Sequence, residues 1–169
     1  MTRHILLVGM MGAGKTTVGE LVAETLGWPY RDSDVDVAVA TGMSVPEIFE
    51  TQGETAFRQA ESEVLARACA GTEPSVISVA GGAVLSAANR DLLRASGTVV
   101  WLRARIETLA ARVGTGVGRP LLDGVPAATL AELSVVRTEL YAEVADLVID
   151  VDDLSPAEVA AAVVQRAAA

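Results

Sequence analysis

The chain has 169 residues and 51% of them are apolar, a composition that excludes a disordered protein and predicts one domain with a buried core. Its 22 Asp and Glu against 13 Lys and Arg give a net charge of -9, which argues against a nucleic-acid-binding surface. A single cysteine, Cys69, excludes an internal disulfide, and we expect a protein of the reducing cytoplasm.

Short apolar runs alternate with helical segments along the chain, and each apolar run has the length of one strand. The first run meets Gly9 at once, so we expect neither a signal peptide nor a membrane span. The predicted strands are 5–8, 28–32, 75–79, 98–102 and 147–151. The predicted helices are 16–26, 44–53, 54–70, 86–95, 106–113, 127–144 and the segment after Ser155. This alternation predicts a single domain over residues 1–169, a three-layer α/β/α sandwich with a central five-stranded parallel sheet.

A glycine-rich segment follows the first predicted strand and precedes a predicted helix. Residues 9–16 read GMMGAGKT and match the pattern G-x-x-x-x-G-K-[ST] in full. The glycines let backbone N–H groups converge on phosphate oxygens, and the helix N-terminus adds partial positive charge. Lys15 can bridge the β- and γ-phosphates, and the Thr16 hydroxyl can ligate Mg²⁺. The segment therefore predicts binding of ATP or GTP with Mg²⁺.

The carboxylate that completes a magnesium shell is less obvious from the sequence. An NTPase that drives motion or signalling has a further apolar strand that ends in Asp, but the strand 75–79 runs into Ala80-Gly81-Gly82 instead. Asp32, at the end of the second predicted strand, is therefore the nearest candidate. It begins the run Asp32-Ser33-Asp34-Val35-Asp36, in which three acids alternate.

Arg58 and Glu61 are three residues apart on a predicted helix, so they share a face and can form an ion pair. With this pair and the glycine-rich segment in place, the chain resembles the shikimate kinases, a family of small P-loop kinases. The resemblance extends over almost the whole chain. Its motifs are GMMGAGKTT at 9–17, DSD at 32–34, IFETQGETAFRQAE at 48–61, AGGAV at 80–84, VGTGVGRPLL at 113–122 and RTELYAEVA at 137–145.

The resemblance implies a P-loop kinase fold with a helical acceptor-binding region at 33–61 and a lid at 112–124. It implies transfer of the γ-phosphoryl group of ATP, with Mg²⁺, to the 3-hydroxyl of shikimate. The products are shikimate 3-phosphate and ADP, in the biosynthesis of aromatic amino acids. The small-molecule partners are shikimate and ATP, and we expect a cytoplasmic monomer that binds neither nucleic acid nor membrane.

The resemblance also implies residue roles at the acceptor. Asp34 hydrogen-bonds the acceptor hydroxyls and is the candidate base, while Arg58 and Arg137 hold the carboxylate. Gly81 and Gly82 bring backbone N–H groups to the ring hydroxyls. A planar guanidinium forms two parallel hydrogen bonds with a carboxylate, which is why arginine suits these two positions.

On the nucleotide side, the resemblance places Arg112 near the adenine and Arg119 in a mobile lid that reaches phosphate and acceptor. Arg119 joins Lys15 and Asp34 as a catalytic residue. The metal residues are Thr16 and Asp32. The other predicted nucleotide-binding positions are Gly12, Ala13, Gly14, Lys15, Thr16 and Thr17.

Asp36 matches no family role, and we interpret it as solvated surface near the start of a helix. Ala80 departs from the family, which usually has a glycine there, and this alanine costs about 1 kcal/mol if the position needs a positive φ. Two alternatives stay open. The first is a related kinase that acts on gluconate or a nucleoside monophosphate, and the second is a nucleotide-binding protein without catalysis.

Overall fold

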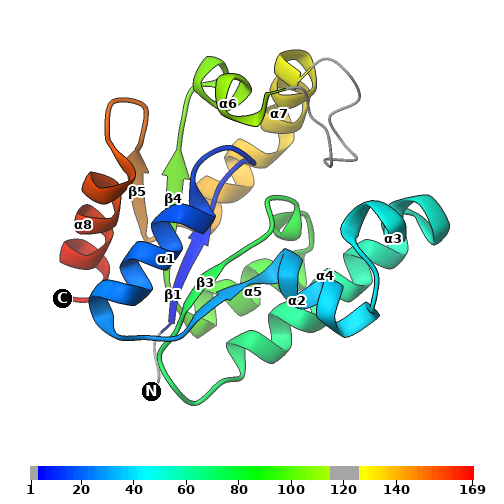
Figure 1. Ribbon diagram of the computed structural model, residues 1–169, viewed down its shortest axis with the longest axis horizontal. Coiled ribbons are helices and arrows are strands. Elements are labelled where there is room, and N and C mark those ends of the chain that lie inside the picture. Colours follow the sequence, from blue (N-terminus) through cyan, green and yellow to red (C-terminus); the bar gives the residue numbers. More distant parts are fainter. Residues whose placement is uncertain (1–3, 115–125) are drawn as a thin grey trace.

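The computed structural model describes residues 4–114 and 126–169, and it contains one five-stranded parallel sheet (Figure 1). The strands are β1 (His4–Val8), β2 (Tyr30–Asp32), β3 (Val76–Ser78), β4 (Gly97–Arg103) and β5 (Leu147–Asp150). They are arranged in the order β2-β3-β1-β4-β5, and every pair is parallel. The fold prediction is confirmed.

Helices cover both faces of this sheet, as expected of a parallel sheet whose strands are apolar on both sides. They are α1 (Lys15–Leu26), α2 (Ser33–Thr41), α3 (Val45–Thr51), α4 (Gly53–Cys69), α5 (Ala87–Ser96), α6 (Ile106–Val113), α7 (Pro126–Val144) and α8 (Pro156–Ala167), with a 3₁₀ turn η1 (Ala83–Leu85). Helices α1 and α8 pack against each other on one face, and α5 and α7 contact each other on the other (Figure 1). None of the helices within 4–114 and 126–169 has the length and apolar character needed to cross a membrane.

Helix α2 is the main element that the sequence did not predict. Its sequence SDVDVAVAT is rich in valine and alternates, which is typical of a strand. The Asp32 carboxylate nevertheless accepts hydrogen bonds from the backbone N–H groups of Asp34 (2.9 Å) and Val35 (3.4 Å). This N-cap satisfies two of the donors that a helix start leaves without a partner, so the chain turns into a helix directly after β2.

Helices α2, α3 and α4 pack together as a lobe beside the sheet (Figure 1). The lobe has its own small core of Val37, Ile48, Phe57 and Val64, separate from the main core around the sheet. A capping box starts α3, because Ser44 and Glu47 exchange side-chain and backbone hydrogen bonds. The lobe and the carboxyl ends of β1, β2 and β3 meet at one edge of the sheet, where parallel α/β folds bind ligands.

Candidate active site

Residues 9–16, called the phosphate cradle below, join β1 to α1. Gly12 and Gly14 have φ of 85° and 95°, a region that favours glycine. A Cβ built on Gly12 would also lie 2.9 Å from Val113 Cγ2, so the loop can follow this path only with glycine there. The Lys15 ammonium donates to the carbonyls of Gly9 (2.8 Å) and Met10 (3.1 Å), which folds the side chain back over the loop. The glycines thus fix the path of the loop between β1 and the start of α1.

The phosphate cradle forms one side of a cavity of about 440 Å³. All predicted site residues line this cavity except Ala13, which is buried in the core, and Arg119, which lies outside the described residues together with most of the predicted lid. Val45, Phe49 and Phe57 add an apolar part to the lining. One concave space therefore brings together segments from the loop after β1 to α7.

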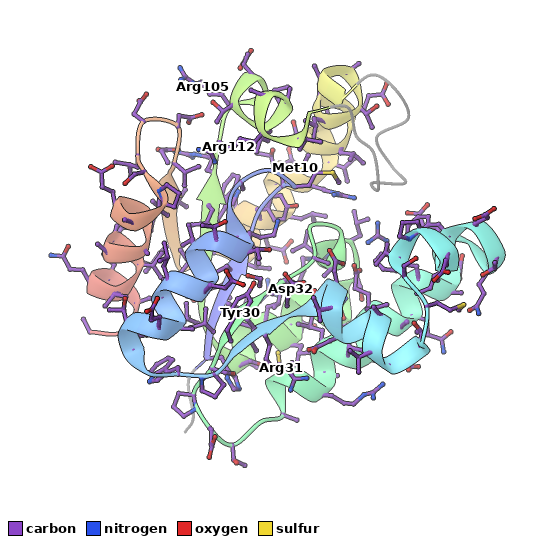
Figure 2. All side chains as sticks on the ribbon, viewed as in Figure 1. Met10, Tyr30, Arg31, Asp32, Arg105 and Arg112 are labelled. Atoms are coloured by element: carbon purple, nitrogen blue, oxygen red, sulfur yellow. The ribbon has the colours of Figure 1, made fainter. Side chains whose placement is uncertain are left out.

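Thr16 and Asp32, predicted as metal ligands, lie in direct contact. The Thr16 hydroxyl donates to Asp32 Oδ2 at 3.1 Å, while Oδ1 of the same carboxylate caps α2. The Tyr30 hydroxyl lies 2.9 Å from Ser78 Oγ and 3.4 Å from Asp32 Oδ2, and burial raises the pKa of this tyrosine. Figure 2 shows Tyr30 and Asp32, the first and last residues of β2, below Met10 of the cradle. The contacts fix a hydroxyl and a carboxylate side by side at the N-terminus of α1.

Arg112 reaches the cradle from α6. Its Nη1 donates to the carbonyls of Gly12 (3.3 Å) and Ala13 (3.4 Å), so its guanidinium lies against the outer side of the loop (Figure 2). This places a cation next to the phosphate cradle and in the lining of the cavity, on the side away from the lobe. The position of Arg112 relative to a bound nucleotide stays a prediction.

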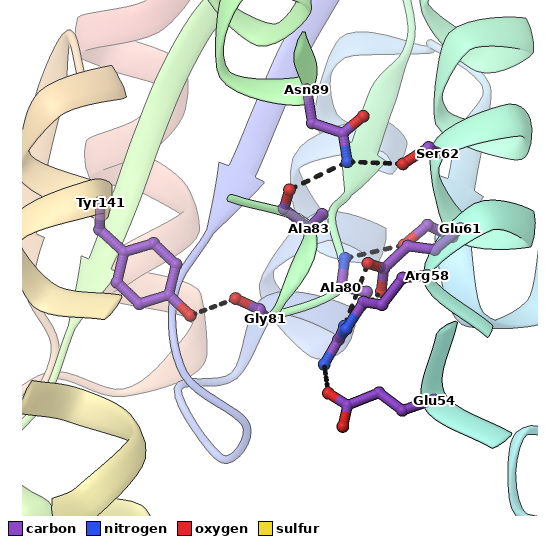
Figure 3. A network of polar contacts seen from close by, with 10 residues as sticks. Glu54, Arg58, Glu61, Ser62, Ala80, Gly81, Ala83, Asn89 and Tyr141 are labelled. Atoms are coloured by element: carbon purple, nitrogen blue, oxygen red, sulfur yellow. Dashed lines mark hydrogen bonds and ion pairs between the residues drawn. The ribbon is translucent and has the colours of Figure 1, made fainter. Parts of the chain in front are cut away.

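A second part of the cavity lining is built around two arginines and two glycines, and we call Arg58, Gly81, Gly82 and Arg137 the arginine wall. Arg58 Nη1 donates to both carboxylate oxygens of Glu61 at 3.1 Å, and Nη2 to Glu54 at 3.4 Å (Figure 3). A Cβ built on Gly82 would lie only 2.5 Å from Arg58 Cζ. The guanidinium therefore packs directly on the backbone of Gly82.

The predicted pairing of Arg58 with Glu61 is confirmed, but the pair is not the exposed one that the spacing alone favours. Glu61 is only 1% exposed, and this burial raises the pKa of its carboxyl to about 7, even though the neighbouring Arg58 acts in the opposite direction. A buried carboxylate without a cation is strongly unfavourable, so the two groups hold each other in place.

Arg137 approaches the same glycine pair from α7. It is only 2% exposed, and its Nη1 would lie 3.3 Å from a Cβ built on Gly81. Two guanidinium groups thus flank the Gly81-Gly82 backbone and line one cavity. In a protein of net charge -9, such a local concentration of cations favours an anionic ligand, and the fork of a guanidinium fits a carboxylate.

The three alternating acids have different environments. Asp32 caps α2 and contacts Thr16, whereas Asp34 lies in the first turn of α2 and lines the cavity. Asp36 pairs with Arg31 at 3.0 Å and is absent from the cavity lining. Asp36 thus lies near the start of a helix, as predicted, but it is only partly exposed and forms an ion pair with Arg31.

Ala80 causes no backbone strain, since among the residues that the structure describes only glycines have a positive φ. Its N–H donates to Ser33 Oγ at 2.8 Å. Sequence reasoning missed one residue at this wall, Tyr141, whose hydroxyl donates to the Gly81 carbonyl. Its spacing of four from Arg137 on a helix is the signal that places both side chains on one face.

Comparisons with known proteins show the family to which the chain is similar. The family model described as shikimate kinase matches residues 11–168. A shikimate kinase of Pseudomonas savastanoi pv. phaseolicola is 42% identical over 167 residues, which cover 98% of this chain and 96% of the relative. A shikimate kinase of Nitrosospira multiformis is 44% identical over 166 residues, covering 98% and 85%.

A solved structure of shikimate kinase from Acinetobacter baumannii in complex with shikimate superposes with a TM-score of 0.93 at 38% identity. The match covers 98% of this chain and 92% of that chain. The fold and the sequence therefore lead to the same family, over nearly the full length of each relative. The chain belongs to the shikimate kinase family.

Proposed function

We propose that this protein transfers the γ-phosphoryl group of ATP to the 3-hydroxyl of shikimate, giving shikimate 3-phosphate and ADP. The observation that carries the proposal is one cavity with a phosphate cradle on one side and two arginines on the other. Membership of the family supports it, as does a relative solved with shikimate. Shikimate has a carboxylate at one end of its ring and hydroxyls at the other, which matches this division of the cavity.

At the acceptor, Arg58 and Arg137 hold the carboxylate, and the backbone N–H groups of Gly81 and Gly82 bind ring hydroxyls. This orientation turns the 3-hydroxyl toward Asp34 and the phosphate cradle. The fixed arginines supply most of the specificity, because an acceptor without a carboxylate would lose the charge-assisted hydrogen bonds to both guanidinium groups. The lobe at 33–61 is thus the acceptor-binding region of a single kinase domain, residues 1–169.

At the nucleotide, the backbone N–H groups of residues 12–17 hold the phosphates, and Lys15 moves from its loop carbonyls to the β- and γ-phosphates. Arg112 lies on the adenine side. Arg119, within the predicted lid at 112–124, reaches over phosphate and acceptor. Closure of the lid would exclude water, so that ATP is not hydrolysed in place of transfer.

The oxygen atoms of Thr16 and Asp32 fit Mg²⁺, a hard cation that binds one or two protein oxygens, substrate phosphates and water. When bound, Mg²⁺ neutralises charge on the β- and γ-phosphate oxygens. Among the described residues, no cluster of three or more His, Cys, Asp or Glu offers a different metal site. We therefore assign the metal to this hydroxyl and carboxylate pair.

In the transfer step, the 3-hydroxyl oxygen forms a bond to the γ-phosphorus as the bond to the β,γ-bridging oxygen breaks and ADP leaves. The hydroxyl proton passes to the Asp34 carboxylate. Phosphoryl transfer depends mainly on positioning and on neutralising charge, so Lys15 and Arg119 contribute more than a strong base would. The protein would do this as a cytoplasmic monomer, without a partner chain in the site.

The test is release of ADP from ATP and Mg²⁺ with shikimate, gluconate or AMP as acceptor, each against a reaction without acceptor. We expect turnover above background with shikimate alone. Turnover with gluconate or AMP and none with shikimate would assign the protein to a related kinase. ATP binding without transfer to any acceptor would assign it to non-catalytic nucleotide-binding proteins.

A further inference from the structure

Tyr141 is a buried tyrosine of α7 to which the proposed transfer reaction assigns no role. It is 1% exposed, and its ring packs near Trp101 with centroids 5.7 Å apart. Its hydroxyl donates to the carbonyl of Gly81 at 2.6 Å (Figure 3). This hydrogen bond joins α7 to the turn between β3 and η1, two segments about sixty positions apart in the chain.

The bond acts on one specific peptide plane. The Gly81 carbonyl and the Gly82 N–H belong to the same planar peptide unit, so a bond to the carbonyl also fixes the direction of that N–H. It further polarises the unit, which makes the N–H a stronger donor. Glycine on both sides of this peptide gives it unusual freedom to rotate, so an external anchor matters here more than elsewhere.

Tyr141 also lies close to Arg137. A Cβ built on Gly81 would be 3.3 Å from the Tyr141 hydroxyl and 3.3 Å from Arg137 Nη1, so both groups contact the same glycine. Burial raises the pKa of Tyr141 to about 12, with the neighbouring Arg137 cation acting in the opposite direction. The hydroxyl is therefore protonated at neutral pH and remains a donor to the carbonyl.

Figure 3 shows that Tyr141 and Arg58 approach the 80–83 turn from opposite sides. The guanidinium of Arg58 packs on Gly82, and the Tyr141 hydroxyl donates a hydrogen bond to the Gly81 carbonyl. We propose that Tyr141 is a positioning residue for the acceptor, which locks the Gly81–Gly82 peptide between α4 and α7 so that the Gly82 N–H and both arginines meet shikimate together. The proposal rests on the proposed function, since it concerns the same acceptor.

The decisive variant is Tyr141→Phe, which keeps the ring in the core and removes only the hydroxyl. We expect the KM for shikimate to rise about tenfold, the cost of one lost anchoring hydrogen bond, while the KM for ATP stays unchanged. Exchange of backbone amides in residues 80–85 should become faster without any ligand, whereas exchange in β1 should not. This second measurement reports the loosened peptide even if turnover is too low to measure.

Ser75→Ala is the matched control. It also removes a buried hydroxyl hydrogen bond, that between Ser75 Oγ and His4 Nδ1 at 2.8 Å. Ser75 lies directly before the same strand, β3, at its amino end, and does not line the cavity. We expect Ser75→Ala to lower the melting temperature as Tyr141→Phe does, without any change in the KM for shikimate.

An unchanged shikimate KM in Tyr141→Phe would overturn the inference, as would an equal rise in both KM values or an equal effect of Ser75→Ala. Amide exchange in residues 80–85 that is no faster in Tyr141→Phe than in the wild type would also contradict it. Wild-type protein without shikimate turnover would instead refute the proposed function, and the inference with it. If only the inference is wrong, the wild type still turns over shikimate, and the contradiction is seen only in the kinetics and amide exchange of Tyr141→Phe.

Discussion

The phosphate cradle and the arginine wall line one cavity and adjoin where Gly81 approaches the Gly9 carbonyl, but they are built in different ways. The cradle is one continuous segment, in which glycine conformations and the start of α1 place backbone N–H groups. The arginine wall takes its groups from α4, from the turn after β3 and from α7. Its geometry depends on buried side chains that hold each other, such as Arg58 with Glu61.

Because of this difference, substitutions in the cradle and in the arginine wall should have different effects. A backbone-built site depends on local conformation, and few of its side chains touch the ligand. A site built from buried guanidinium groups requires partners for desolvated charges, so its function and its stability are linked. Changes in the cradle should therefore impair phosphoryl transfer, while changes in the arginine wall should impair acceptor binding and the stability of the fold.

Lys15→Ala should have the largest effect on turnover. It removes the cradle side chain whose positive charge can stabilise the γ-phosphoryl group in the transition state. We therefore expect kcat to fall about 10³-fold. Shikimate binding, measured by calorimetry without nucleotide, should be unaffected. A parallel loss of shikimate binding would show that the two halves are not independent.

Asp34→Asn should reduce kcat about 10²-fold, because it removes the proposed proton acceptor while keeping the shape of the side chain. Asp36→Asn is the matched control, two residues along the same helix but paired with Arg31 outside the cavity lining. Steady-state kinetics of both variants decide the matter. Similar losses in the two would remove Asp34 from its role.

Gly82→Ala should separate the arginine wall from the cradle. The new Cβ would displace the Arg58 guanidinium from its place on the backbone. We expect the KM for shikimate to rise about 30-fold, with nucleotide affinity retained. Ala80→Gly, at a position without strain, should behave as wild type. A wild-type KM in Gly82→Ala would contradict the packing of Arg58 on this glycine.

The pH dependence of stability should reveal the buried carboxyl of the arginine wall. The pKa of Glu61 is raised from 4.5 to about 7, so the folded state binds the proton more tightly than the unfolded chain. Its contribution to the free energy of unfolding should be complete below pH 4.5 and decline by about 3 kcal/mol as the pH rises to about 7.

Urea unfolding of the wild type and of Glu61→Gln, at several pH values between about 4 and 8, tests this. The difference between the two proteins isolates Glu61 from the other titrating groups. We expect the wild type to lose stability relative to the variant as the pH rises through this window. A constant difference, or one of opposite sign, would exclude a raised pKa for Glu61.

The sequence predicted the cradle and the parallel sheet well because both are local. Residues 9–16 contain every residue that the loop needs, and each strand is a short apolar run. Helix α2 could not be predicted from its own residues, since its start depends on the Asp32 side chain acting as N-cap. The burial of Glu61 and the bond from Tyr141 to Gly81 depend on packing between distant segments, which spacing alone does not report.

The most direct test of the division into two halves is a pair of calorimetric titrations on Arg58→Ala and the wild type, one with shikimate and one with ADP and Mg²⁺. The wild type should bind both ligands. In Arg58→Ala, shikimate binding should be lost, while ADP should bind with the affinity of the wild type. An equal loss of both ligands in Arg58→Ala, or retention of both, would contradict the assignment of Arg58 to the acceptor.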